Sequence, residues 1–380
     1  MADFDSEPRR LSTLERASAL LTGVRDAAEL YGVSRFRIAA RLAWLWRRHG
    51  FRPGEAHSEG LSNPRLTDEH LAGAIPEARL VELQLHANRA DLSALVEDKV
   101  AFHVHCSGAH LPVPRLYAVV DGSGGWSEGG APISDAQDLE SALEHAPTDL
   151  FVKPAGTDWG IGVQAFTRTS TGFQDVSSGT VETASSLVAA LTSSRFGRMV
   201  VQERLRNHEE IELLTGTKTL QTVRIQTVLT SRSECVMGGC IFKFAAGGGV
   251  ADNIVRGTTG NFLAGVGLAS GVLRAAVRYR ASQVGLERVE THPQTGLPIA
   301  GFRLPWWEEA KDLVVRAATV FAPLRTIGWD VALTPAGPVL VEGNLRWSPW
   351  NCLAACETDL SYSREMATLL ALLRTAPALQ

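Results

Sequence analysis

The chain has 380 residues, of which 45% are hydrophobic and 21% are charged, and its formal net charge is −4. This composition is that of a globular protein large enough for two or three domains, and it gives no reason to expect a polyanionic partner such as nucleic acid. No stretch approaches the roughly 18 apolar residues of a membrane span, and the N-terminus lacks the apolar segment of a signal peptide. We therefore expect a cytoplasmic protein without a transmembrane segment.

The cysteines do not form a recognisable framework. There are five of them, an odd number without a Cys-x-x-Cys pair: Cys106, Cys235, Cys240, Cys352 and Cys356. This pattern favours buried thiols over disulfides or a zinc site. Because no activating neighbour can be named for any of them, we do not expect a nucleophilic cysteine.

Helical signals dominate the N-terminal region. Ser12 and Glu15 form a capping box for a helix over residues 12–31, and Ser34 caps a second helix that reaches about residue 49. The second helix has no acidic residue and carries five arginines among aromatic and aliphatic side chains: Arg35, Arg37, Arg41, Arg47 and Arg48. Such a basic amphipathic helix either docks on an anionic membrane surface or a protein partner, or packs on its own domain with its arginines in solvent.

The middle of the chain alternates short helices and strands. A long helix is expected over residues 78–97. Strands are expected at residues 115–120, 150–154, 161–167 and 199–205. Lys153 stands in the second of these strands, directly before the glycine-bearing loop 155–160. Phosphate is bound in this way when backbone N–H groups approach it and an ammonium neutralises its charge, although a plain hairpin with a glycine turn has the same pattern.

Two later strands each contain a cation. Arg224 lies within the β-branched stretch 219–230, and Lys243 lies within residues 235–245. A lone cation in a strand usually reaches toward solvent, whereas two strands that aim their cations inward indicate an anion site. The following loop, residues 251–261, has glycines and small polar residues that suit an anion-binding nest.

Two apolar arms near the C-terminus predict a hairpin. Residues 328–333 and 338–344 are apolar and β-branched, and the Pro-Ala-Gly between them suits a tight turn. A turn centred near Ala336 places Asp330 opposite Glu342, with a tolerance of about one residue. The flanking sequence predicts amphipathic helices on both sides of the hairpin, at residues 305–324 and 363–374.

The acids of this hairpin suit a metal site. Because side chains alternate along a strand, Leu340, Glu342 and Asn344 are expected on one face. Two facing carboxylates repel each other, and their burial is unfavourable unless a cation or hydrogen-bond donors compensate. Oxygen ligands from Asp330, Glu342 and Asn344 suit Mg²⁺. The alternative is a solvated hairpin face with incidental acids.

The order of these features resembles the ATP-grasp superfamily over about residues 95–350. The resemblance lies in Lys99 before the stretch Gly108 to Pro114, Val152-Lys153-Pro154, Val201-Gln202-Glu203, Asp330 and Glu342-x-Asn344. Within the superfamily the chain is similar to the sugar-transfer-associated branch. That similarity lies in Thr222-Val223-Arg224, Ala251-Asp252-Asn253, Leu304-Pro305-Trp306-Trp307, Gly328-Trp329-Asp330 and Val341-Glu342-Gly343-Asn344.

The resemblance implies an α+β protein with the ATP-grasp fold, in which two α+β subdomains clasp ATP. It implies a first ATP-grasp part at residues 91–205, including a small lid subdomain at about 121–200, and a C-terminal subdomain with the metal site at residues 206–380. Residues 1–90 depart from the family, because they are expected to form a helical N-terminal region in place of the usual α/β first domain.

A nucleotide site is implied by the same resemblance. Its members, all expected to contact ATP, are Lys99, Lys153, Gly156, Gly160, Gln202, Glu203, Leu205 and Glu210. The two lysines would bind the α- and β-phosphates, and the loop 155–160 would fold over the triphosphate as a mobile lid. The residues from Gln202 to Leu205 would edge the adenine, and Glu210 would reach the ribose hydroxyls.

The resemblance also implies a metal site and catalytic residues. Asp330, Glu342 and Asn344 would hold two Mg²⁺ ions, with Mn²⁺ as an alternative metal and Glu342 as the bridging ligand. The implied catalytic residues, which would face the γ-phosphate or the substrates, are Arg224, Lys243 and Asn253, the last beside the loop at Gly257. The alternative for Arg224 is a structural arginine paired with an acid.

The implied activity is that of an ATP-dependent, ADP-forming ligase. It would activate a small-molecule carboxylate as an acyl phosphate for attack by an amine, giving an amide or peptide-type bond. One alternative is the same machinery with a thiol, hydroxyl or phosphoryl acceptor. Another is a non-catalytic nucleotide-binding or scaffold protein that docks through the arginine-rich helix at residues 34–49.

Overall fold

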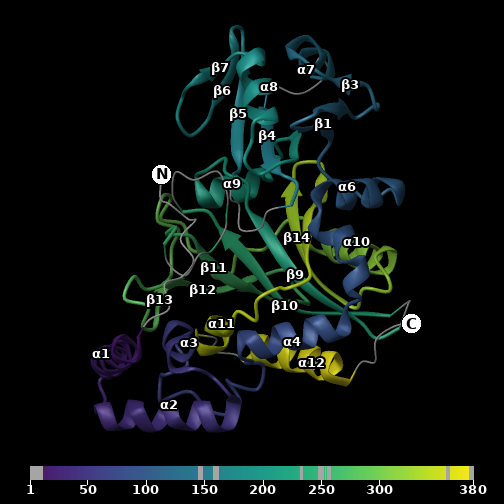
Figure 1. Cartoon of the computed structure of the whole chain (residues 1–380). Helices are drawn as coiled ribbons and strands as arrows, with labels where there is room; N and C mark the ends of the chain where they lie inside the picture. The colour runs from purple at the N-terminus through teal and green to yellow at the C-terminus, as the bar shows by residue number, and fades with distance from the viewer. Residues whose placement is uncertain are drawn as a thin grey trace.

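The computed structural model describes residues 12–143, 149–156, 162–231, 234–246, 252, 254, 258–356 and 360–375. It contains one eight-stranded and one seven-stranded sheet, both antiparallel throughout, and a group of helices at the N-terminal end (Figure 1). The α+β composition and the helical N-terminal region expected from the sequence are confirmed. Among the described residues, no helix is both long and apolar enough to cross a membrane.

Helices form in the N-terminal region as expected, and the first two begin at the predicted caps. These helices are α1 (Thr13–Tyr31), α2 (Arg35–His49) and α3 (Pro53–Ser58). Ser12 and Glu15 form the capping box of α1, and the Ser34 side chain accepts a hydrogen bond from the Arg37 backbone N–H at the start of α2. The buried side of α2 packs with α1, α3 and the following loop around a separate small core that includes Ile38, Leu45 and Phe51.

The prediction of one helix over residues 78–97 is wrong, because the helix is interrupted there. The chain forms α4 (Glu77–Ala87), a 3₁₀ turn (Ala90–Leu92) and α5 (Ala94–Glu97), followed by α6 (Lys99–Gly108). The break lies at Asn88, whose backbone is extended. The Asn88 Oδ1 accepts hydrogen bonds from the backbone N–H groups of Arg325 and Thr326, and its Nδ2 donates to the Thr326 carbonyl. A side chain that pairs with a distant strand thus ends the helix.

The eight-stranded sheet has the strand order β3-β2-β1-β8-β4-β5-β6-β7. Its strands are β1 (Leu116–Asp121), β2 (Gly124–Ser127), β3 (Pro132–Ile133), β4 (Asp149–Pro154), β5 (Gln164–Thr169), β6 (Gly172–Asp175), β7 (Val181–Glu182) and β8 (Met199–Glu203). The helices α7 (Ala136–Ala142) and α8 (Ala184–Thr192) pack on one face, where Val152 and Val201 are buried with them. Lys153 alternates with Val152 and therefore faces away from these helices.

The seven-stranded sheet has the order β13-β12-β11-β10-β9-β14-β15. Its strands are β9 (Thr222–Leu229), β10 (Cys235–Phe244), β11 (Phe262–Val266), β12 (Leu273–Tyr279), β13 (Leu286–Val289), β14 (Thr326–Thr334) and β15 (Gly337–Asn344). The helices in this part of the chain are α9 (Glu209–Thr215), α10 (Trp307–Val320), α11 (Asn351–Cys356) and α12 (Ser361–Thr375). The helix α10 packs on one face through the main core, and α12 packs on the other with Leu80 of α4. The predictions of helices over residues 305–324 and 363–374 are confirmed by α10 and α12.

The predicted hairpin forms, and its register is confirmed. Pro335 and Ala336 separate β14 from β15, and Asp330 pairs with Glu342. The expectation that Leu340 shares a face with Glu342 is wrong. The register shifts between Asp330 and Val331, so that Leu340 pairs with Val331 and joins its core, and the extra residue of this bulge turns Glu342 to the opposite face.

The described cysteines form no disulfide, as expected from their spacing. Cys106, Cys240 and Cys352 are buried as predicted, whereas Cys235 is only half-buried. Burial raises the pKa of Cys106 to about 12 and that of Cys235 to about 11. Both thiols are therefore held in the protonated, unreactive form at neutral pH.

Candidate functional site

Three charged side chains form a row across the seven-stranded sheet. In the strand register, Arg224 on β9 faces Asp330 on β14, and Asp330 faces Glu342 on β15. Directly opposed residues on one face of a sheet lie about 5 Å apart, so the register alone brings them together. Arg224 donates two hydrogen bonds to Asp330, from Nε to Oδ1 at 2.5 Å and from Nη2 to Oδ2 at 2.7 Å. The predicted catalytic arginine is thus fixed by a buried acid.

Lys243 on β10 adds a second cation to this row. Its Nζ lies 3.1 Å from Asp330 Oδ2 and 3.4 Å from Asp252 Oδ1. The Asp252 Oδ2 accepts hydrogen bonds from the backbone N–H and the hydroxyl of Thr222, at 2.8 and 2.7 Å. Asp252 was not predicted as a site residue. The signal that points to it is its place in the Ala251-Asp252-Asn253 motif, directly before a residue that was predicted.

Gly328 leaves room for this row, and Gly343 leaves room on the opposite side of β15. A Cβ added to Gly328 would lie 3.2 Å from the Arg224 Cδ and 2.7 Å from the Trp347 Cβ. A Cβ added to Gly343 would lie 2.8 Å from Val96 Cγ1 on the other side of the strand. The glycine between Glu342 and the next ligand candidate therefore allows α5 to approach β15 closely.

The pKa values of the two facing acids are shifted in opposite directions. Burial opposes the charge of Asp330, but Arg224 and Lys243 outweigh it and hold the pKa of Asp330 well below its ordinary value. Burial, and then the negative charge of Asp330, raise the pKa of Glu342. The pKa of Lys243 is raised despite burial, because Asp252 and Asp330 stabilise its charge. Asp330 is thus the compensated anion, and Glu342 is the acid that still needs a counter-charge.

The other sheet contributes Lys153 from β4, and Lys99 begins α6. Lys153 is 5% exposed, and burial lowers the pKa of its ammonium to about 8, while Glu342 raises it and Lys99 lowers it. These influences mean that Lys153 lies within electrostatic reach of the charged row. The Lys99 backbone N–H donates to the Ala155 carbonyl at 3.0 Å, which joins the start of α6 to the loop after β4.

A cavity of about 270 Å³ lies where these elements converge. The predicted site residues that line it are Lys99, Arg224, Lys243, Glu342 and Asn344. Asp330 lies behind this wall and is 2% exposed. The wall also contains residues that sequence reasoning missed, namely Glu77, Glu97, Arg346 and Trp350. Their positions depend on the packing of α5 against β15 and of α4 against the residues that follow β15, for which no sequence motif gives a signal.

The oxygen donors fit Mg²⁺ in part. Glu342 and Asn344 line the cavity side by side, with Asn344 Nδ2 at 3.5 Å from Glu342 Oε1. The raised pKa of Glu342 marks a carboxyl whose ionisation a divalent cation would favour. Both oxygens of Asp330 are already engaged by Arg224 and Lys243. Within the described ranges, no three His, Cys, Asp or Glu side chains group closely enough to hold a metal ion, so the two-ion arrangement stays a prediction.

The remaining predicted residues lie apart from this cavity or outside the described residues. Gln202 and Glu203 end β8 in the eight-stranded sheet, Leu205 follows them, and Glu210 is exposed in the first turn of α9. Gln202 lies on the same face of the sheet as Lys153, because it is two residues beyond Val200, which pairs with Lys153. Gly156 is described as part of a bend, whereas Gly160, Asn253 and Gly257 lie outside the described residues.

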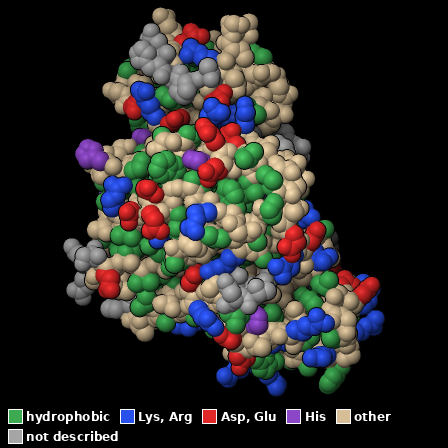
Figure 2. All heavy atoms as spheres, turned by 180° about the vertical axis from the view of Figure 1, so that it is seen from behind, with side chains coloured by type: hydrophobic (Ala, Val, Ile, Leu, Met, Phe, Trp, Pro, Cys, Tyr) green, Lys and Arg blue, Asp and Glu red, His purple; other side chains and the backbone are tan. Residues whose placement is uncertain are grey.

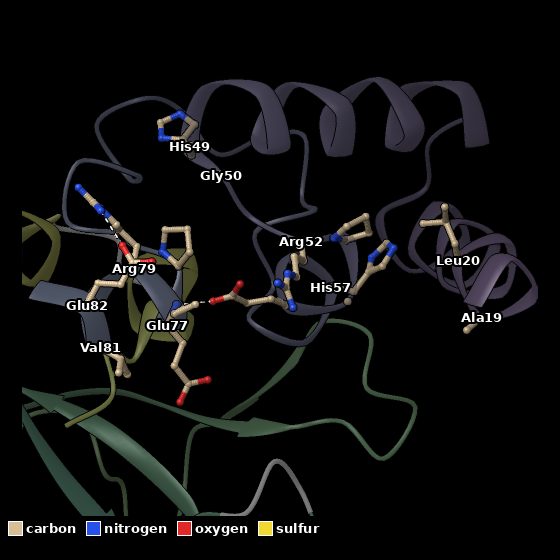
Figure 3. A pocket seen from close by; sticks show the side chains of 15 residues that line it. Ala19, Leu20, His49, Gly50, Arg52, His57, Glu77, Arg79, Val81 and Glu82 are labelled. Carbon is tan, nitrogen blue, oxygen red and sulfur yellow. Dashed lines mark hydrogen bonds and ion pairs between the residues drawn. The ribbon is translucent and has the colours of Figure 1, made fainter. Parts of the chain in front are cut away.

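A wider groove of about 1570 Å³ borders the N-terminal helices (Figure 3). Its wall includes Leu20 of α1, His49 of α2, His57 of α3 and the first turns of α4. Glu77 and Val81 line both this groove and the smaller cavity. The Glu55 side chain accepts a hydrogen bond from the Glu77 backbone N–H at 2.8 Å and so attaches α3 to the start of α4. The helix α4 is thus the partition between the two hollows.

Residues 78–361 match the model of a family described as sugar-transfer associated ATP-grasp. No curated protein matches the chain.

The solved structures to which the chain is similar include two ligases and a carboxylase. The VanG D-Ala:D-Ser ligase from Enterococcus faecalis aligns with a TM-score of 0.40 and 14% identity, over 75% of this chain and 64% of that one. Biotin carboxylase from Campylobacter jejuni aligns with a TM-score of 0.45 and 11% identity, over 82% and 53%. The D-alanine-D-alanine ligase from Coxiella burnetii aligns with a TM-score of 0.41 and 10% identity, over 78% and 64%. The chain thus spans 53% to 64% of the length of these proteins.

Proposed function

We propose a function from one premise: the chain belongs to the sugar-transfer associated ATP-grasp family. The proposed activity is that of an ATP-dependent, ADP-forming ligase that joins a carboxylate to an amine. The observation that carries the proposal is the meeting of three cations, Lys99, Arg224 and Lys243, with Glu342 and Asn344 around one cavity. Lys153 of the other sheet acts electrostatically on the same acids.

The proposed reaction has two steps. A carboxylate is a poor electrophile because oxide is a poor leaving group, so the γ-phosphoryl group of ATP is first transferred to a carboxylate oxygen, with release of ADP. The amine then attacks the carbonyl carbon, a C–N bond forms, and the C–O bond to phosphate breaks as inorganic phosphate leaves and the amine loses its proton. Both steps gather negative charge in one place and need the exclusion of water.

The buried cations suit this chemistry because they are held in place beforehand. One edge of the Arg224 guanidinium is fixed by Asp330, while the residue also lines the cavity. Lys243 is fixed between Asp252 and Asp330. A planar guanidinium and a nearby ammonium can bind the oxygens of a transferring phosphoryl group or a carboxylate without reorganising. Their roles are therefore to orient the two reacting groups and to neutralise them.

The nucleotide would lie between the two sheets. Lys99 and Lys153 are the proposed phosphate ligands, and Lys153 is mostly charged at neutral pH because its pKa is about 8. Glu342 and Asn344 would hold Mg²⁺, with Asp330 as a further negative charge behind them. When bound, this ion supplies positive charge to the phosphate oxygens.

An assay with mixed substrates tests the proposal. The protein is incubated with Mg-ATP and a pool of amino acids and uronic acids, and ADP and new product masses are measured. We expect ADP to form together with a mass equal to acid plus amine minus water. Hydroxylamine added in place of the amine should trap the acyl phosphate as a hydroxamate. ADP with an ester or thioester mass would support another acceptor, and ATP binding without any ADP would support a scaffold.

A further inference from the structure

The exposed face of α2 has a restricted composition. Nine of its 15 residues are exposed, and each of them is arginine, alanine, phenylalanine or tryptophan: Arg35, Phe36, Arg37, Ala39, Ala40, Ala43, Trp46, Arg47 and Arg48. The Phe36 side chain is 83% exposed and the Trp46 side chain is 61% exposed. Large aromatic side chains left in water next to cations are a feature that the fold itself does not require.

The buried face of α2 already fulfils the structural role of the helix. Ile38, Leu42 and Leu45 pack into the N-terminal core. The half-buried Arg41 donates through Nε to the Leu61 carbonyl at 3.2 Å, and its guanidinium lies 4.6 Å from the centre of the Trp44 ring. These contacts hold the helix without help from the outward-facing residues.

Among the residues that the structure describes, no acid pairs with the exposed arginines of α2. In the part of the chain that the structure describes, Arg35, Arg37, Arg47 and Arg48 form no ion pair. Of the nearby acids, Asp26 pairs with Arg25 at 2.9 Å, and Asp68 acts on the half-buried Arg41. Figure 2 shows basic and hydrophobic side chains gathered at the lower end of the molecule, where the N-terminal helices lie. This end of the protein therefore complements an anionic surface.

We propose that the exposed face of α2 is a docking surface for an anionic lipid bilayer. Phe36, Ala40 and Ala43 follow one another at helical spacing, so a short apolar line runs along the middle of this face, and Arg47 stands at its end. Arginines beside it would bind lipid phosphates, and Phe36 and Trp46 would enter the interface between headgroups and acyl chains. A nucleic acid would use the arginines but would leave the alanine line and Phe36 in water. The bilayer is therefore the better match, and this inference does not depend on the ligase proposal.

The position of α2 also relates the docking surface to the groove. His49 ends α2 and lines the groove of about 1570 Å³, whose far wall is α4 (Figure 3). The same α4 residues, Glu77 and Val81, line the smaller cavity. A protein docked through α2 would therefore present one wall of this groove close to the lipid surface.

Co-sedimentation with vesicles tests the proposal on the full chain. We expect binding to vesicles of phosphatidylcholine mixed with phosphatidylglycerol, no binding to phosphatidylcholine alone, and weaker binding at high salt as the charges are screened. The variant R37Q/R47Q/R48Q should lower the affinity by about 100-fold, since each arginine near an anionic bilayer contributes about fivefold. Glutamine keeps the helix propensity close to that of arginine.

A matched variant controls for net charge. R206Q/R316Q/R374Q removes the same charge from exposed arginines on other elements, and it should change vesicle affinity by less than about twofold. A third variant, F36A/W46A, keeps every charge and should still weaken binding, because the apolar insertion is lost. Absence of binding to anionic vesicles at low salt, equal affinities of the two arginine variants, or binding to DNA without binding to vesicles would each overturn the proposal.

Discussion

Cationic side chains are concentrated in two regions of the protein, and their environments in these regions are opposite. At the cavity, Arg224 and Lys243 are buried, and each is ion-paired to Asp330. On α2, arginines such as Arg37 and Arg47 are exposed and have no acidic partner among the described residues. A buried cation without a partner is strongly unfavourable, whereas a hydrated surface cation needs none. The cavity therefore has fixed cations that suit one bound geometry, and α2 has adaptable cations that suit a surface.

The contrast between the two regions requires that the buried cations depend on Asp330 for their stability. For Asp330→Asn we expect the free energy of unfolding to fall by about 3–5 kcal/mol, because Arg224 and Lys243 would lose their shared anion. The folded-state pKa of Asp330 lies below its ordinary value of 3.8, so its contribution to stability is complete above that pH and is lost as the pH falls. Denaturant unfolding at neutral and acidic pH measures both effects. A loss below about 1 kcal/mol at neutral pH would contradict this interpretation.

The second prediction concerns the shape of the buried cation. Arg224→Lys keeps the charge but loses the planar fork, so we expect kcat to fall by about 10²–10³ while ATP affinity changes only a few-fold. Measurements of kcat, nucleotide affinity and melting temperature on this variant separate the roles of Arg224. A fall in melting temperature and ATP affinity with unchanged kcat would mean that the pair with Asp330 is purely structural.

Local sequence signals predicted those parts of the fold that local chemistry decides. The caps at Ser12 and Ser34 form as expected, and the hairpin turn was sufficient to place Asp330 opposite Glu342. Each of these depends on a few neighbouring residues. The α+β class was implied by the resemblance to the ATP-grasp superfamily, which rests on short motifs of the same local kind.

What sequence reasoning missed depends on distant contacts. The long helix expected over residues 78–97 breaks because Asn88 pairs with Thr326, far along the chain. The bulge beside Glu342 places Leu340 on the opposite face of the strand. Lys243 forms an ion pair with Asp252, which lies in a loop and was not predicted as a site residue. Such features are decided by how elements dock, and a single sequence carries no pattern for them.

Lys153 gives a third prediction, on pH. With a pKa of about 8, this lysine loses its proton at mildly alkaline pH, so ATP affinity should fall by up to about tenfold per pH unit above 8. The stability of the protein without nucleotide should depend on pH in the opposite direction. Because the pKa of Lys153 in the folded protein lies below its ordinary value of 10.5, the free energy of unfolding should rise as the pH increases from 8 toward 10.5. Lys153→Arg, which stays charged, should remove both pH dependences. Identical pH profiles for the two proteins would contradict this role.

The smallest effect is expected on α2. The variant R37Q/R47Q/R48Q should change the free energy of unfolding by less than about 0.5 kcal/mol for each residue, since these side chains are exposed and unpaired within the described chain. Denaturant unfolding beside Asp330→Asn shows the contrast directly. A loss as large as that of the buried acid would mean that the α2 arginines stabilise the fold.

The central claim is that the acid facing Asp330 serves the reaction and not the fold, and Glu342→Gln tests it most directly. Because burial and the negative charge of Asp330 disfavour the charged form of Glu342 and raise its pKa, an uncharged glutamine of the same shape should fit, and the free energy of unfolding should change by less than about 1 kcal/mol. Loss of this acidic ligand, which lies beside Asn344 on the cavity wall, should abolish ADP formation from Mg-ATP in the presence of the substrate pool. A folded Glu342→Gln protein without detectable turnover is the result we expect. Undiminished ADP formation by this variant would contradict the account.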